Sequence, residues 1–133
     1  MSSKLPRRPL SEKNSYHLNE FREREIIYFC LQYNYWKRRA KVVVVRNSSD
    51  EWNSPTEEEA LTIAQCKENM KIVEDACKTA YPEQWELLLK GVTDPDSNWN
   101  NLKLVKGLAV GRDKYYELKH QVYYLVSQKD YRV

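Results

Sequence analysis

Basic and hydrogen-bonding side chains gather near the C-terminal end of the sequence, and their chemistry suits the recognition of DNA bases. Arginine and lysine donate hydrogen bonds to guanine, while a carboxylate such as that of Glu117 accepts from cytosine. A glycine before a helix, here Gly111, lets the backbone approach a phosphate near the helix N-terminus. We therefore predict a DNA-binding surface formed by Lys103, Lys106, Gly111, Arg112, Lys114, Tyr116, Glu117, Lys119 and His120.

The apolar residues around this surface have the spacing of a helix-turn-helix, which needs a first helix with one buried face, a tight turn and a second helix with a polar front. We predict the first helix over residues 100–107 and the second over residues 112–127. The expected core residues are Leu104, Val105 and Leu108 in the first half, Val110 in the turn, and Tyr115, Leu118, Val122 and Leu125 in the second helix. A plain αα-hairpin within a helical bundle would show the same spacing and stays an alternative.

Other chemistries lack residues at a suitable spacing. The three cysteines, Cys30, Cys66 and Cys77, are odd in number and form no C-x-x-C pair, so they indicate neither a disulfide framework nor a zinc site. His17 and His120 lie far apart in the sequence, and no glycine-rich phosphate-binding loop or nucleophile elbow is present. We expect no metal, no cofactor and no enzymatic activity, with the cysteines as small core residues.

The charges of this 133-residue chain are segregated, although the net charge is only +3. Residues 1–46 carry eleven basic and four acidic side chains, a net +7. Residues 47–100 carry four basic and twelve acidic side chains, a net −8, and residues 101–133 carry seven and three, a net +4. Clustered positive charge is typical of proteins that bind polyanions, because several phosphates are neutralised together. Solvated charged faces would give the same pattern.

The N-terminal third is predicted to be a flexible basic arm, residues 1–12, followed by a helical segment, residues 13–46. Within that segment a long helix is expected over residues 15–40, because apolar residues recur there at intervals of three and four. These residues are Ile26, Phe29, Tyr33, Trp36 and Ala40. The basic run 37–41 lies at the helix C-terminus, where it complements the helix dipole or contacts nucleic acid.

The middle of the chain is predicted to contain a short extended piece, Val42–Val45, a linker over residues 47–54 and a second long helix over residues 55–80. Ser54 would cap this helix, with Pro55 at its first position. Its apolar residues have the spacing of a seam that packs on another helix. The seam consists of Ile63, Cys66, Met70, Val73 and Cys77. The two long helices would pair as a hairpin within one chain or as a dimer seam between chains.

The last segment, residues 81–133, is the predicted DNA-binding domain. A helix is expected to begin at Pro82, and residues 91–98, which are rich in turn formers, are expected to form a loop before the helix-turn-helix. The predicted fold class is therefore all-α, with long N-terminal helices followed by a C-terminal helix-turn-helix.

Three stretches resemble a known family: SPTEEEALTIA, YPEQWELLLKGV and NLKLVKGLAVGRDKYYELKHQVYYLVSQ. Together they are similar to the RinA/ArpU-like phage late transcription regulators, whose helix-turn-helix resembles region four of bacterial sigma factors. The resemblance covers residues 54–128. It implies a phage or prophage protein that activates late genes in a Gram-positive host by binding promoter DNA. It also implies that Arg112, Lys114 and Tyr116 lie on the front of the recognition helix.

The leading hypothesis is a sequence-specific activator that binds double-stranded DNA as a homo-oligomer, because one helix-turn-helix reads only a few base pairs. The host RNA polymerase is a candidate partner for the acidic residues Glu57, Glu58 and Glu59. The alternatives are a small terminase-like DNA-packaging or helical assembly protein and a bundle that binds only proteins. No signal peptide or membrane-spanning segment is recognised in the sequence, so we expect a location in the bacterial host cytoplasm and no membrane partner.

Overall fold

The computed structural model describes residues 15–48 and 56–129 and, for residues 42–48, the backbone alone. Within these residues the chain forms helices and turns and no strand, so the all-α prediction is confirmed. In chain order the helices are α1 (Glu20–Leu31), α2 (Tyr33–Ser48), α3 (Glu57–Ala80), the short 3-10 helix η2 (Pro82–Gln84), α4 (Trp85–Thr93), α5 (Trp99–Lys106) and α6 (Arg112–Ser127).

The predicted arm, residues 1–12, lies outside the described residues, as do residues 49–55. None of the described helices is long and apolar enough to span a membrane.

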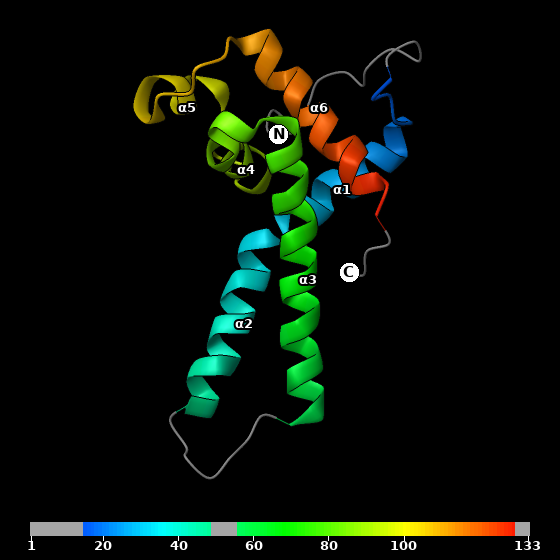
Figure 1. The fold of residues 1–133 in the computed structure, drawn as a ribbon, viewed down its shortest axis with the longest axis vertical. Helices are drawn as coiled ribbons and strands as arrows, with labels where there is room; N and C mark the ends of the chain where they lie inside the picture. Colours follow the sequence, from blue (N-terminus) through cyan, green and yellow to red (C-terminus); the bar gives the residue numbers. More distant parts are fainter. Residues whose placement is uncertain (1–14, 49–55, 130–133) are drawn as a thin grey trace.

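Two parts of the molecule can be distinguished in Figure 1. Helices α2 and α3 lie side by side and run antiparallel, and they form one elongated end. We call residues 33–48 and 57–72 the stalk. The other end, which we call the head, consists of α1, residues 73–80 of α3, α4, α5 and α6. The two parts are continuous because α3 packs on α2 and also on α4 and α6.

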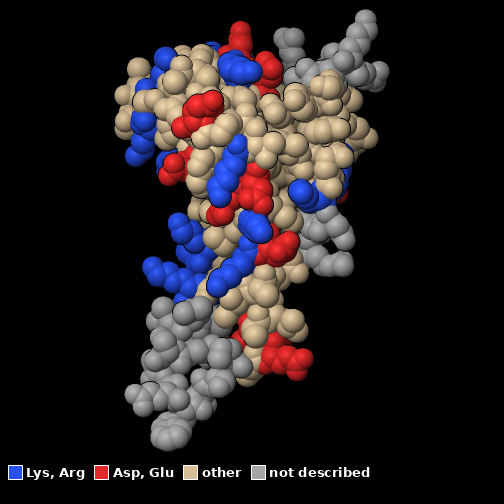
Figure 2. All heavy atoms as spheres, in the orientation of Figure 1, with Lys and Arg blue, Asp and Glu red and all other residues tan. Residues whose placement is uncertain are grey.

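The stalk buries the predicted apolar face of α2 against α3. Tyr33, Trp36 and Ala40 are buried, and the hydroxyl of Tyr33 donates a hydrogen bond to the carboxylate of Glu74 on α3. The described outer surface of α2, up to Lys41, is basic and the first turn of α3 is acidic, as the lower half of the molecule in Figure 2 shows. The exposed charged residues are Lys37, Arg38, Arg39 and Lys41 on α2 and Glu57 and Glu58 on α3.

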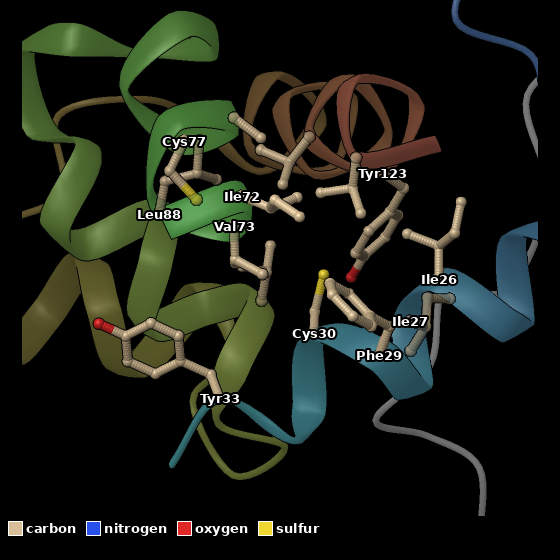
Figure 3. Close-up of a cluster of buried hydrophobic side chains, with 14 of the residues drawn as sticks. Ile26, Ile27, Phe29, Cys30, Tyr33, Ile72, Val73, Cys77, Leu88 and Tyr123 are labelled. Atoms are coloured by element: carbon tan, nitrogen blue, oxygen red, sulfur yellow. The ribbon is translucent and has the colours of Figure 1, made fainter. Parts of the chain in front are cut away.

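The head is built around a core to which α1, α3, α4, α5 and α6 all contribute, and Figure 3 shows a part of it. Phe29 and Cys30 of α1, Val73 of α3, Leu88 of α4 and Tyr123 of α6 are all almost completely buried. Because α1, α3 and α4 all pack against α6, this helix is covered over a wide sector of its surface. The burial of α6 fixes its position relative to the other helices.

The predicted single helix over residues 15–40 is wrong, because the chain forms two helices that meet at Gln32. Helix α1 begins only at Glu20, where the side chain of Asn19 accepts hydrogen bonds from the backbone of Phe21 at 2.9 Å and Arg22 at 3.0 Å. At Gln32 the backbone N–H bonds to the carbonyl of Phe29 at 3.1 Å, three residues back, which interrupts the helical ladder. The break lets α1 pack on α4 and α6 while α2 packs on α3.

Other predicted boundaries of the long helices shift for local reasons. Val42–Val45, predicted to be extended, lies within α2, which continues to Ser48, so the helical ladder prevails over β-propensity. Helix α3 begins at Glu57, and its N-cap is Thr56 rather than Ser54. The Thr56 hydroxyl accepts from the backbone of Glu59 at 3.1 Å, and the Glu59 carboxylate accepts from the backbone of Thr56 at 3.4 Å, which is a capping box.

The helices of the C-terminal segment lie close to their predicted bounds. Helix α6 spans Arg112–Ser127, as predicted. Helix α4 continues to Thr93, so the loop predicted over residues 91–98 is shortened to residues 94–98. In that loop the Asp94 carboxylate accepts hydrogen bonds from the backbone of Asp96 at 2.9 Å and the hydroxyl of Ser97 at 3.0 Å. These bonds lower the pKa of Asp94, the backbone bond being the largest cause.

Candidate functional site

The candidate site is the segment from α5 to the first turns of α6. Helix α5 is capped by Asn98, whose side chain accepts from the backbone of Asn101 at 2.9 Å. It ends at Gly107, which has a φ of 79° and a ψ of 30°. This left-handed conformation favours glycine because it brings no Cβ into collision with the backbone. Gly107 therefore turns the chain out of α5 and toward α6.

Two side chains from outside the turn hold its backbone in place. The amide of Gln84 donates to the carbonyl of Gly107 at 3.0 Å and accepts from the N–H of Ala109 at 2.7 Å. The indole of Trp99 donates to the carbonyl of Val110 at 3.1 Å. The turn between α5 and α6 is thus bonded both to the segment before α4 and to the first residue of α5.

The N-terminus of α6 is open to solvent. Gly111 is its exposed N-cap, and no side chain of the described residues caps the helix there. Arg112 and Lys114 follow in the first turn and are both exposed. The unbonded backbone N–H groups and the helix dipole add positive potential at this end of the helix.

The predicted DNA-binding residues divide into an exposed and a buried group. The exposed members are Lys103, Lys106, Gly111, Arg112, Lys114 and Glu117, and Tyr116 is half-buried. Lys114 and Glu117 form an ion pair with 3.8 Å between Nζ and Oε1 on the open surface, where such pairs contribute little. The Lys103 ammonium lies 5.9 Å from the centre of the Trp99 ring. Four cations of α5 and α6 therefore remain available to solvent and ligands.

Lys119 and His120 are not on the open face, which corrects the prediction for both residues. Lys119 is 6% exposed and His120 is 7% exposed. His120 faces α1, and its Nδ1 lies 2.5 Å from Oε1 of Glu23, without the alignment of a hydrogen bond. Lys119 lies over the rings of Tyr115 and Tyr116, at 5.5 Å and 5.7 Å from their centres. Both side chains are buried because α6 is covered on more than its apolar face. Helix α1 packs against positions of α6 that the apolar spacing alone predicts to be exposed.

The apolar face of α5 is also different from the prediction. Leu104 is 83% exposed and Val105 is 67% exposed, whereas Leu102 is completely buried. Helix α5 packs on α4 through the side that carries Leu102, so the side with Leu104 and Val105 is turned outward. Leu108 is buried and Val110 packs against the core, as predicted for the turn.

The predicted seam residues of α3 are used within the chain. Cys66, Val73 and Cys77 are buried, and Ile63 and Met70 are half-buried against the core. All three cysteines are buried and unbonded. Burial raises the pKa of the Cys30 thiol to about 12 and also raises that of Cys77. Among the described residues no group of three or more metal-ligating side chains comes together.

Gln84 and Trp99 are the residues of the site that sequence reasoning missed. A tryptophan at the start of a short helix next to a predicted turn was a usable signal for the second of these. No sequence pattern indicates that Gln84 bonds to a turn more than twenty residues away. Comparison with known proteins adds no assignment, since no family model, no curated protein and no solved structure matches the chain.

Proposed function

We propose that this protein is a DNA-binding transcriptional regulator that reads duplex DNA with the N-terminal half of α6. The observation that supports this most directly is the pair Arg112 and Lys114, which are exposed at an uncapped helix N-terminus. Arginine and lysine in this position can reach base edges while the helix N-terminus faces a phosphate. The turn is held by Gln84 and Trp99, so α6 meets DNA in one defined orientation.

The neighbouring residues have complementary roles in this proposal. Lys103 and Lys106 of α5 are exposed on the same segment and would bind phosphates, which set register without reading sequence. Glu117 accepts from cytosine, and Tyr116 provides apolar and hydroxyl contacts beside it. Lys119 and His120 are excluded from base contacts because both side chains are buried.

The proposed class of regulator rests on the resemblance of the sequence to the RinA/ArpU-like phage late regulators. In this hypothesis α5, the turn and α6 are the helix-turn-helix, and the chain acts as a homo-oligomer that activates late genes. The exposed Glu57 and Glu58 lie at the free end of the stalk, away from α6, where the host RNA polymerase could bind them (Figures 1 and 2).

One observation favours the second candidate, a terminase-like assembly protein with DNA-binding activity. The stalk exposes large side chains, since Leu61 is 64% exposed and Tyr35 is also exposed. Such residues would be buried where stalks of several copies pack together. A ring of many subunits in light scattering would favour this candidate, whereas a dimer would favour the regulator.

The DNA-binding proposal is tested with the double variant Arg112→Ala/Lys114→Ala. Its control is Lys67→Ala/Lys71→Ala, which removes two exposed lysines from α3. Fluorescence anisotropy with duplexes selected by the wild-type protein from a random pool gives Kd at several salt concentrations. We expect the first variant to bind the selected duplexes about tenfold or more weakly and to lose its preference for them over random duplexes, because two base contacts are lost.

The control variant is expected to bind as the wild type does. Equal affinity of the Arg112/Lys114 variant and the wild type would contradict the proposal. So would wild-type binding that does not depend on salt.

A further inference from the structure

A polar cavity lies between the 94–98 loop, the start of α5 and the N-terminal half of α6. Its volume is about 350 Å³, within the range of small-molecule sites. Ser97, Asn98 and Trp99 line one side, and Arg112, Tyr116 and Lys119 of α6 line the other. The cavity therefore combines two cations, one carboxylate, three aromatic rings and short hydrogen-bonding side chains.

Among the residues that line the cavity, Lys119 is unusual. Its side chain is 6% exposed and lines the cavity, yet no carboxylate or hydrogen-bond acceptor among the described residues pairs with its ammonium. The ammonium lies over the rings of Tyr115 and Tyr116, 5.5 Å and 5.7 Å from their centres. Burying an ammonium without an anion is unfavourable, and burial lowers the pKa of Lys119 to about 8. An anion that enters the cavity would supply the missing partner.

Arg112 supplies a second cation on the same face of α6. It lies seven residues before Lys119, which is two helical turns, and it also lines the cavity. Its guanidinium suits the bidentate binding of a phosphate. Asp96 lines the opposite wall with its exposed side chain, where a carboxylate would accept from a ligand hydroxyl. The half-buried rings of Trp99 and Tyr116 offer apolar surface to a planar group.

We propose that this cavity is a phosphate-binding site, with Lys119 and Arg112 as its two cations, and that its ligand is a small phosphorylated molecule of mononucleotide size. A ribose hydroxyl would face Asp96 and a base would contact the aromatic rings. A phosphate of the DNA backbone presents the same chemistry from a second source. Because Arg112 also belongs to the proposed DNA-binding surface, a bound mononucleotide would compete with DNA for this side chain. The site itself does not depend on the DNA-binding proposal.

The decisive variant is Lys119→Met, with Lys71→Met as the matched control on the exposed surface of α3. Methionine has a similar length and no charge, so it fills the same space without the unpaired ammonium. We expect Lys119→Met to unfold at the same temperature as the wild type or a higher one at pH 7, measured by circular dichroism. A loss of binding in this variant is then not caused by unfolding.

Binding is measured by calorimetry on the full chain, with inorganic phosphate and with AMP as probes, at pH 7 and low salt. We expect saturable binding of AMP that weakens about tenfold in Lys119→Met and is unchanged in Lys71→Met, since a charge-assisted contact is lost only in the first. Both Lys119-dependent AMP binding and Lys119-dependent phosphate binding would support the site.

A second measurement assigns the source of the phosphate. If the DNA backbone supplies it, Lys119→Met weakens duplex binding in anisotropy and lowers the salt slope by about one, while AMP and inorganic phosphate do not bind saturably. If neither AMP, phosphate nor DNA binding depends on Lys119, the site is refuted. An equal loss in Lys71→Met refutes it as well, because the effect is then one of general charge. Binding of AMP without any binding of DNA would support this site and contradict the proposed DNA-binding function instead.

Discussion

The stalk and the head bury their helices in different ways. In the stalk α2 and α3 cover one face of each other, and the remaining surface carries charges and exposed residues such as Tyr35 and Leu61. In the head α6 is contacted by three other helices, and even Lys119 and His120 are buried. The difference shows that the position of α6 is determined by many contacts. The first turn of α6, with Arg112 and Lys114, projects from a rigid support, whereas the stalk is stabilised by a single interface.

A close contact in the head gives the largest expected effect. A Cβ at Gly91 on α4 would lie 2.1 Å from the hydroxyl of Tyr115, so Gly91→Ala must displace the buried Tyr115 ring or the helix that carries it. We expect the free energy of unfolding to fall by about 1–3 kcal/mol, although alanine favours helices over glycine. Chemical denaturation followed by circular dichroism measures this change.

A second substitution separates this contact from other causes. The Tyr115 hydroxyl is buried without a hydrogen-bond partner, so Tyr115→Phe alone is expected to be neutral or stabilising. Combined with Gly91→Ala it should restore part of the lost stability, because the nearest atom is removed while ring carbons at 3.1 Å and 3.2 Å remain. Strictly additive effects of the two substitutions would show that α4 and α6 are not packed as described.

The titration of Lys119 is expected to have a smaller effect on the free energy of unfolding. Its pKa is about 8 in the folded protein, lowered by burial, and near 10.4 when unfolded. The unfolded chain therefore binds more protons between these values, and the contribution of Lys119 to stability rises with pH. At pH 7 wild type should be less stable than Lys119→Met by about 1–2 kcal/mol, and the gap should narrow by pH 9.5.

The difference in stability between the wild type and Lys119→Met removes the effects of the other titrating groups, which both proteins share. Burial raises the pKa of the Cys30 thiol to about 12 although the Lys119 charge lowers it, so Cys30 stays protonated at both pH values in either folded protein. Burial also raises the pKa of Tyr115, with the same result. Denaturation curves at the two pH values give the difference directly. A gap that stays constant with pH would mean that Lys119 is not buried as a cation.

The smallest effect is expected in the stalk. Thr56→Ala removes the capping box at the start of α3, which we expect to lower stability by about 1 kcal/mol or less. Because this end of α3 is far from the core of the head, hydrogen exchange should accelerate most in the first turns of α3, while amides of α6 that exchange by global unfolding accelerate by no more than the loss of global stability. A larger acceleration in α6 than in the first turns of α3 would contradict the division into head and stalk. Ser127→Ala, at the end of α6, is a control that leaves the cap of α3 intact.

Much of the helical architecture could be predicted from sequence because it depends on local signals. Gly111 and the apolar repeat after it place α6 at Arg112–Ser127, and Pro82 marks the start of η2. The break at Gln32 was not predictable in this way, since the apolar spacing of three and four continues through it. Only the packing of α1 across α6 explains why the chain bends there.

The candidate site could be predicted only in part, for a similar reason. Arg112 and Lys114 are exposed as expected, since they precede the covered part of α6. Lys119 and His120 were misplaced because charged residues are rarely buried, and only the tertiary fold shows that α1 covers His120. Helix α5 carries apolar residues on two sides, and its own sequence cannot decide which side packs on α4.

The length of α3 sets a fixed separation within the molecule. From Glu57 to Val73, which lies in the core of the head, the helix rises about 24 Å at 1.5 Å per residue. A partner that binds the acidic end of the stalk is therefore held at least this far from the packed core beneath α6. α3 thus acts as a rigid spacer, and inserting or deleting one helical turn in the stalk would move the partner along the axis while leaving the surface of α6 unchanged.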